Sequence, residues 1–210
     1  MLQVIQQFIP VLLAGFLVNL EIGVAAVGIA VAVGVPLSLL RRRFGLVRRL
    51  IRTCIGLMQA LPTYVAMFFI LILLPRDLSV LGHTITGVIA VVLAQSIYLT
   101  AYVAEEAYEA LGHLSRNDRE RALLFLPNLM RGFVVVVMSS GFGAAVGVSE
   151  AVSATMRQAE RLSTPGERIL LFAVAIAFFA VVVGSLNVLI RRLIRHFTHR
   201  GPVAYRWGGR

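Results

Sequence analysis

The chain has 210 residues, of which 59% are hydrophobic, with a formal net charge of +10 and a mean hydropathy of +0.86. This composition excludes a separate soluble domain, since the longest stretches between apolar segments, residues 105–131 and 149–168, are too short for an independent core. We therefore expect one transmembrane domain over residues 1–210. The charge does not indicate a nucleic-acid partner, because the basic residues lie at the ends of apolar stretches, where they fix topology and contact membrane lipid.

Five apolar stretches are each close to the length of about 20 residues that crosses a bilayer as a helix. They cover residues 13–40, 55–74, 80–104, 132–148 and 169–190. If they cross the membrane in turn, 16 of the 20 arginines fall on one side: Arg41, Arg42, Arg43, Arg48, Arg49, Arg52, Arg116, Arg119, Arg121, Arg131, Arg191, Arg192, Arg195, Arg200, Arg206 and Arg210. Arginines in short loops stay cytoplasmic, so the sequence predicts an all-α integral membrane protein with its N-terminus outside. Its tail, residues 191–210, is then cytoplasmic.

The first span follows a short apolar lead-in, residues 1–10, which we expect at the outer interface and ending at Pro10. Glu21, beside Asn19, lies toward the outer third of this span. An intramembrane carboxylate indicates a solute path or a polar partner. The alternative, a carboxylate shallow enough to reach interfacial water, stays open.

Other polar side chains fall in or near the later spans. A basic loop, residues 41–52, precedes the second span, which contains Gln59. Ser139 and Ser140 in the fourth span are candidates for a polar path, although serines also bond to their own helix backbone. The outer segment Ala151–Arg168 has helical spacing, mixed charge and a break at Thr164-Pro165-Gly166, and it is a candidate landing surface for a partner outside the cell.

Residues 106–131 form the most polar segment and are predicted to face the cytoplasm. Ser115, with Asp118 three residues on, predicts the start of a short amphipathic helix. Arg116 and Glu120 are four residues apart on it, and Pro127 is expected to end it. Such a helix either covers the inner end of the bundle or docks a cytoplasmic partner, and both interpretations stay open.

Catalytic and metal-binding motifs are not found in the sequence. Four scattered histidines and the single Cys54 predict neither a metal site nor an internal disulfide. The sequence has no glycine-rich phosphate loop and no nucleophile–base pair in a familiar context. We therefore expect no cofactor and no enzymatic activity, and any energy must come from a partner.

The order of several motifs resembles the transmembrane permease subunits of type I ABC importers, in the branch serving polar amino acids and related cations. The similarity runs from about residue 14 to 195. It is carried by Gly15-Phe16-Leu17-Val18-Asn19-Leu20-Glu21-Ile22, Gln59-Ala60-Leu61-Pro62, Ala101-Tyr102-Val103-Ala104-Glu105 and Gly147-Val148-Ser149-Glu150. Gln59 stands where the family has arginine, and Ser139 and Ser140 stand within the place of a Lys-Asp-Thr-Ser-like run. The resemblance implies the five-helix permease fold of that family.

Such permeases carry a cytoplasmic Glu-Ala-Ala motif, followed by glycine, on a coupling helix that docks into the ATPase. Counted from Glu105, the motif falls at Glu120, Arg121 and Ala122, in a coupling segment shortened by several helical turns. Ser115, Asp118 and Arg119 precede it. A rival alignment uses Glu106-Ala107-Tyr108 with Gly112.

The resemblance implies a permease subunit in a bacterial plasma (inner) membrane, working with an ABC ATPase, a second permease copy or homologue and an extracytoplasmic solute-binding protein. The candidate solute path comprises Asn19, Glu21, Gln59, Ser139 and Ser140. One alternative is a degenerate permease-like scaffold or regulator that does not transport, and another is an ATP-independent channel or secondary transporter.

Overall fold

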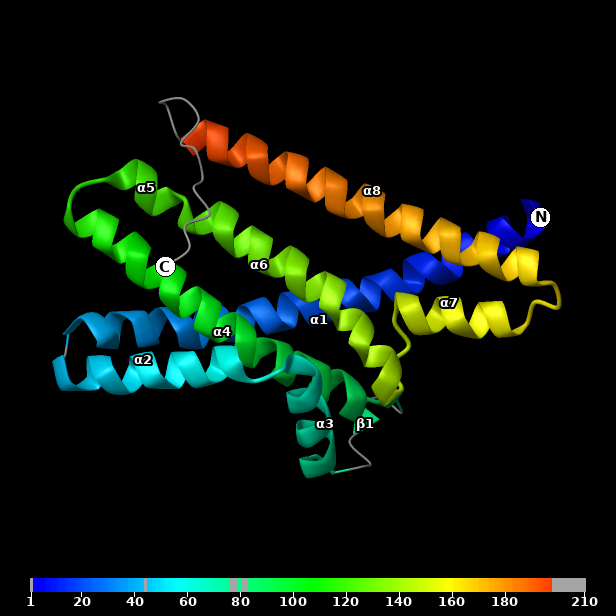
Figure 1. Cartoon of the computed structure of the whole chain (residues 1–210), viewed down its shortest axis with the longest axis horizontal. Helices are drawn as coiled ribbons and strands as arrows, with labels where there is room; N and C mark the ends of the chain where they lie inside the picture. The colour runs from blue at the N-terminus through cyan, green and yellow to red at the C-terminus, as the bar shows by residue number, and fades with distance from the viewer. Residues whose placement is uncertain (1, 44, 76–78, 81–82, 198–210) are drawn as a thin grey trace.

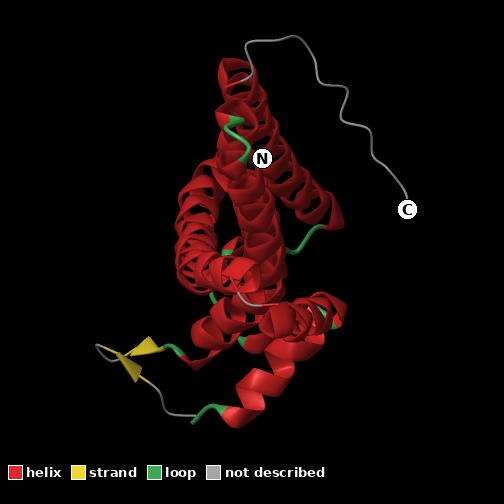
Figure 2. Cartoon of the chain, turned by 90° about the vertical axis from the view of Figure 1, so that its left-hand side faces the viewer, coloured by secondary structure: helices red, strands yellow, loops and turns green. Residues whose placement is uncertain are grey.

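The computed structural model describes residues 2–43, 45–75, 79–80 and 83–197, and this part of the chain is almost entirely helical. The elements in chain order are α1 (Leu2–Arg43), α2 (Gly45–Ala60), α3 (Thr63–Leu73), β1 (Ser79–Val80), β2 (His83–Thr84), α4 (Thr86–Ser115), α5 (Arg119–Leu123), α6 (Phe125–Ser139), the 3-10 helix η1 (Ser140–Val146), α7 (Ala151–Glu160) and α8 (Pro165–Phe197). The two short strands pair antiparallel, with Ser79 opposite Thr84, and their hairpin lies to one side of the helices in Figure 2.

The long helices lie lengthwise in the molecule, with α1 inclined to α4, α6 and α8, and the two ends of the molecule differ (Figure 1). At one end, α4 finishes close to the short helix α5, and Arg42 at the end of α1 is bonded to Ser115 at the end of α4. At the other end, α7 lies beside the beginning of α8 and the first turns of α1. We call these the α5 end and the α7 end.

Four helical segments in the described part are long and apolar enough to cross a membrane: Val4–Arg43, Thr86–Ser115, Arg119–Val146 and Pro165–Phe197. A fifth is formed if α2 and α3 count as one broken span. The chain is therefore a multi-pass membrane protein whose described part is almost entirely helical. Two predicted spans are displaced. The helix predicted over residues 80–104 is α4, which begins at Thr86 and continues to Ser115. The helix predicted over residues 132–148 begins earlier, at Phe125 in α6.

The second predicted span, residues 55–74, is not one straight helix. α2 and α3 meet at an angle of 94°, and Pro62 between them has an extended backbone conformation with φ −62° and ψ 121°. Proline has no N–H to donate and disfavours the helical conformation of the residue before it, so a Leu61–Pro62 pair breaks the helix here. The predicted loop over residues 41–52 is also corrected, since α2 already begins at Gly45.

α1 is a continuous helix from Leu2, so the prediction of a separate lead-in ending at Pro10 is wrong. Both Pro10 and Pro36 lie inside it. Each proline removes one backbone hydrogen bond of the helix, a loss that is tolerated in a membrane bundle where neighbouring helices surround the freed carbonyl group.

Small residues let α1 approach its neighbours closely at the centre of the fold. A Cβ on Gly34 would lie 2.9 Å from the Thr100 carbonyl oxygen of α4, and one on Gly15 would lie 2.8 Å from the backbone of Ala151 in α7. Ala26 beside Leu99 is fully buried in the same packing. Backbone contact of this kind is typical of membrane helices, which pack by van der Waals contact at small residues.

α8 packs on the rest of the molecule along its length, since Leu171 and Ala175 in its first half and Ile190 in its second half are buried. Phe178 and Phe179 meet Phe16 of α1 edge to face, with ring centroids 5.1 and 5.8 Å apart. Other α8 side chains are largely exposed, and Ile176 and Val181 are 70% and 68% exposed. An apolar exposed face on a spanning helix is suited to lipid or to another transmembrane chain.

Candidate functional site

The predicted coupling residues lie on and around α5. Arg119, Glu120 and Arg121 are exposed, whereas Ala122 is 7% exposed and turned toward the bundle. α5 contacts both α4 and α6, so it closes the connection between these two helices. The described part of the chain gives Arg119 and Glu120 no hydrogen-bond or ion-pair partner, so α5 presents mixed charge on a fixed backbone.

The start of this short helix differs from the prediction. Ser115 is the last residue of α4, and Asn117 adopts a left-handed backbone conformation with φ 59°. The N–H of Asp118 then donates to the His113 carbonyl oxygen at 2.9 Å, which closes the end of α4. Asp118, not Ser115, caps α5, because its side chain accepts from the backbone N–H of Arg121 at 3.2 Å.

Two further predictions for this segment are corrected by the same geometry. Arg116 precedes α5, so Arg116 and Glu120 do not share a helix face. Pro127 does not end a helix but lies in the first turn of α6, where its missing N–H would in any case have no helical acceptor.

Ser115 belongs to a cluster that fastens the end of α1 to the end of α4. Its hydroxyl accepts from Arg42 at 3.0 Å and donates to the Gly112 carbonyl oxygen at 2.9 Å. Arg41, which is 6% exposed, pairs with Glu105 at 2.8 Å and stacks over the Tyr108 ring at 4.1 Å. Removing one partner of this pair would be destabilising, because a buried arginine without a carboxylate partner is costly.

A polar layer beneath α5 joins α4 to α6. The Asn128 side chain donates to the Glu106 carboxylate, and Arg131 donates to the Asn128 side-chain oxygen at 3.4 Å. The Tyr102 hydroxyl donates to the Asn128 carbonyl oxygen at 3.1 Å. Ala107, between the two α4 residues of the rival motif, is 5% exposed. The rival motif thus takes part in contacts inside the bundle, while the first alignment lies on the exposed helix.

The five candidate solute-path residues do not form one site. Asn19 and Ser140 are fully buried and bonded to each other, with 2.7 Å from the Asn19 amide nitrogen to the serine hydroxyl. Glu21 and Gln59 are exposed on α1 and α2. Ser139 is half-buried and donates to the Gln95 side-chain oxygen of α4 at 3.1 Å.

Glu150 completes the buried cluster around Asn19. It is fully buried and caps α7 by accepting from the backbone N–H groups of Val152 and Ser153, each at 2.8 Å. Asn19 donates to the same carboxylate at 3.2 Å and accepts from the Ala151 N–H at 3.1 Å. Burial raises the pKa of Glu150 above its ordinary value, although the hydrogen bonds from Val152, Ser153 and Asn19 act in the opposite direction.

Sequence reasoning did not place Glu150 or Gln95 among the site residues. The signal for Glu150 was its position at the end of the quoted Gly147-Val148-Ser149-Glu150 motif, directly before a helical run. Gln95 had no sequence signal beyond being an amide in an apolar span.

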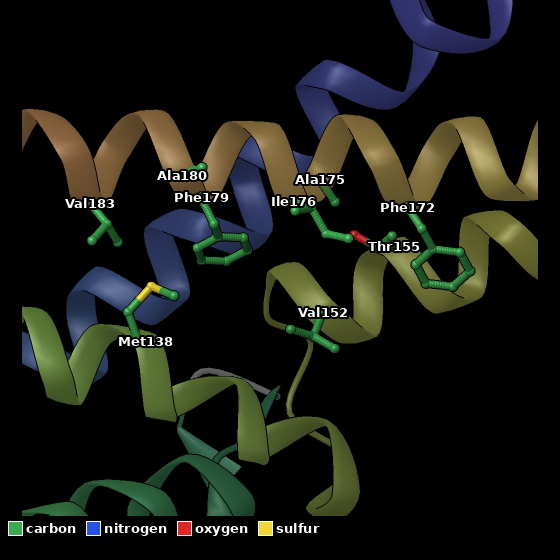
Figure 3. A pocket seen from close by; sticks show the side chains of 9 residues that line it. All are labelled: Met138, Val152, Thr155, Phe172, Ala175, Ile176, Phe179, Ala180 and Val183. Atoms are coloured by element: carbon green, nitrogen blue, oxygen red, sulfur yellow. The ribbon is translucent and has the colours of Figure 1, made fainter.

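An apolar cavity of about 520 Å³ lies between α6, α7 and α8 (Figure 3). Met138, Val152 and Phe179 are among its lining residues. Its polar group, the Thr155 hydroxyl, already donates to the Ala151 carbonyl oxygen at 2.7 Å. The described residues contain no group of histidine, cysteine or acidic side chains that could hold a metal ion.

Comparisons with known proteins match this architecture. Residues 25–113 match the model of the family described as binding-protein-dependent transport system inner membrane component. An amino acid ABC transporter crystallised with histidines superposes with a TM-score of 0.65 at 19% identity, covering 90% of this chain and 96% of that one. The methionine ABC transporter MetNI, in inward-facing conformations, gives a TM-score of 0.64 at 14% identity, covering 88% of this chain and 97% of that one.

No curated protein matches the sequence. The chain shares the fold of the matched chains of these two ABC transporters, and the family match spans the second half of α1 through most of α4. It ends at His113, so α5 lies outside the matched residues.

Proposed function

We propose that the chain is a permease subunit of an ATP-driven ABC importer for polar amino acids or related small solutes. The family match and the two superpositions support a transmembrane transport component. The amino acid transporter crystallised with histidines lends support to the choice of solute. The chain does not hydrolyse ATP in this proposal, and a partner ABC ATPase supplies the energy.

The proposed orientation places the α5 end in the cytoplasm of a bacterial cell and the N-terminus and α7 end outside its plasma membrane. Arg41 and Arg42 at the α5 end belong to the arginine-rich side of the sequence, whereas Arg157 and Arg168 belong to the arginine-poor side. This asymmetry is the positive-inside rule applied to the observed helix ends. Two permease subunits then line the path, and an external solute-binding protein delivers solute at the α7 end.

The observation that carries the proposal is α5. It is a short exposed helix fixed at one end by the Asp118 cap and on its inner side by Ala122, so it offers Arg119 and Glu120 to a partner without a rearrangement of the bundle. Preorganised charged groups favour specific docking, because little conformational entropy is lost on binding. The ATPase therefore docks on α5 in this proposal.

The test uses a photocrosslinking amino acid at position 120 in the native membrane, with position 160 as the matched control. Both wild-type residues are exposed glutamates on helices, at opposite ends of the molecule. We expect a crosslink from position 120 to a P-loop ATPase and none from position 160. Crosslinks from position 120 to lipid only, while a P-loop ATPase still co-purifies, contradict docking on α5.

A second candidate function, a permease-like scaffold that does not transport, is favoured by one observation. α5 has only five residues, which limits the area it can bury on an ATPase. This candidate predicts that no P-loop ATPase co-purifies with the chain from its own membranes in mild detergent. Recovery of the ATPase, and its loss with Glu120→Lys but not Glu160→Lys, would exclude the scaffold.

A further inference from the structure

The first two turns of α2 carry an unusual concentration of positive charge. Arg48, Arg49 and Arg52 are all exposed, and none has an ion-pair partner among the residues that the structure describes. α2 contains no acidic residue. Arg48 and Arg52 are one helical turn apart, so their side chains share one face of the helix.

The three arginines line a single concavity together with Gly45, the first residue of α2. Its volume is about 240 Å³. Because one water molecule occupies roughly 30 Å³ in the liquid, the concavity has room for a phosphate group and part of what it is bonded to.

The position of the charges at the beginning of a helix is electrostatically unfavourable without an anion. The N-terminal end of a helix carries a partial positive charge, and acidic side chains normally balance it. The first turn of α2 contains no acidic residue. Arginine forks match phosphate oxygens in pairs, and free N–H groups of a first helical turn also bind anions, so a phosphate would relieve both features.

Apolar side chains beside the arginines indicate where the phosphate comes from. Ile51 and Ile55 are 6% and 2% exposed and fix α2 against α4, whereas Leu50 and Leu57 are 65% and 67% exposed. A helix that offers arginines and exposed leucines together fits a lipid, which has an anionic headgroup and acyl chains. A protein partner would also carry positive side chains that need acidic side chains to pair with, and α2 has no acidic side chain.

We propose that Arg48, Arg49 and Arg52 form a binding site for the phosphate of an anionic phospholipid, such as phosphatidylglycerol. The proposed orientation decides only which leaflet supplies the lipid, namely the inner one. The site does not depend on whether the chain transports a solute. Arginines near an anionic membrane surface each contribute on the order of 1 kcal/mol, or about fivefold in affinity. The three together are expected to contribute on the order of 100-fold.

Native mass spectrometry of the purified full chain tests the site by titration with phosphatidylglycerol and with phosphatidylcholine. We expect preferential phosphatidylglycerol binding that weakens on the order of 100-fold in the triple variant Arg48→Gln, Arg49→Gln, Arg52→Gln. The variant of equal charge on α8, Arg191→Gln with Arg192→Gln and Arg195→Gln, is expected to weaken binding less, because these arginines lie toward the end of a helix, where no free N–H groups assist them. Equal losses in both variants, or no loss in the α2 variant, overturn the site.

Further arms separate the possible ligands and guard against misfolding. Glycerol 3-phosphate at the lipid concentration is expected not to compete, and full competition would assign the site to free phosphate compounds. The triple lysine variant keeps the charge but loses the paired hydrogen bonds, so an intermediate affinity is expected while circular dichroism stays unchanged. Unchanged lipid binding with loss of a co-purifying ATPase in the α2 glutamine variant would assign the arginines to a protein partner.

Discussion

Asn19→Leu tests whether the buried cluster at the α7 end holds three separate elements together. The Asn19 side chain bonds to the Ser140 hydroxyl, to the Glu150 carboxylate and to the Ala151 N–H, across sequence separations of 121 to 132 residues. Leucine has a similar volume but makes none of these bonds. At about 1 kcal/mol for each cross-helix hydrogen bond, the loss in the free energy of unfolding is about 3 kcal/mol.

The expected loss is measurable as a thermal shift. For a chain of 150–250 residues, each 1 kcal/mol lowers Tm by about 2–4 °C, so Asn19→Leu should melt about 6–12 °C below the wild type. The assay follows helix content by circular dichroism at 222 nm in one detergent. Glu21→Gln is the matched control, because Glu21 is two residues away on the same helix and exposed. A Tm within 1 °C of the wild type for Asn19→Leu would refute the reasoning.

A double-mutant cycle identifies the partner that dominates. Glu150 keeps its two backbone donors when Asn19 is lost, so its carboxylate remains partly satisfied. If the Asn19–Glu150 bond accounts for most of the loss, Asn19→Leu should lower the free energy of unfolding much less in a Glu150→Leu background than in the wild type. Strict additivity of the two substitutions would instead assign the effect to the bonds with Ser140 and Ala151.

Three further predictions concern other contacts. Glu105→Ala should lower the free energy of unfolding, measured by chemical denaturation, by about 2 kcal/mol, because it leaves Arg41 buried without its carboxylate partner. The expected loss is moderate because Glu105 itself is about a third exposed. No change would mean that Arg41 reaches solvent. Gly34→Val should prevent the α1–α4 contact and lower the yield of folded protein in size-exclusion chromatography, whereas Gly28→Val, where a Cβ meets nothing within 4 Å, should not. The pKa of the Glu150 carboxyl is raised above its ordinary value of 4.5, so the folded state binds the proton more tightly than the unfolded state. The free energy of unfolding should therefore fall as the pH rises from 4.5 through that pKa. Glu150→Gln should lack this dependence when melting is followed against pH, and an identical pH profile in both proteins contradicts the prediction.

The sequence predicted the helical class and the approximate places of the apolar segments, because spanning helices need long apolar runs whatever they pack against. It did not predict where helices end. Pro10 and Pro36 lie within α1, yet Pro62 separates α2 from α3 at 94°. A proline only removes one bond and constrains its neighbour, so the surrounding helices decide whether the chain continues or bends.

The site was predicted unevenly for a related reason. α5 was found near its predicted place because Asp118 and the residues after it form a local pattern, although the cap was shifted from Ser115 by the left-handed turn at Asn117. The partnership of Asn19 with Glu150 depends on how α1 lies against α7, and no local pattern encodes a contact between residues 131 positions apart. Charge patterns that act locally are therefore easier to predict than buried polar pairs.

α6 connects the two ends on which the proposed function depends. Asn128 near its beginning is bonded to Glu106 of α4 beneath α5, and η1, which continues from its last residue, places Ser140 on Asn19. Between them, Gly132 lets α6 lie against Leu99, where an added Cβ would approach to 2.8 Å. Because a close-packed helix transmits displacement instead of absorbing it, a force applied to α5 by a docked ATPase would act through α6 on the buried cluster at the α7 end.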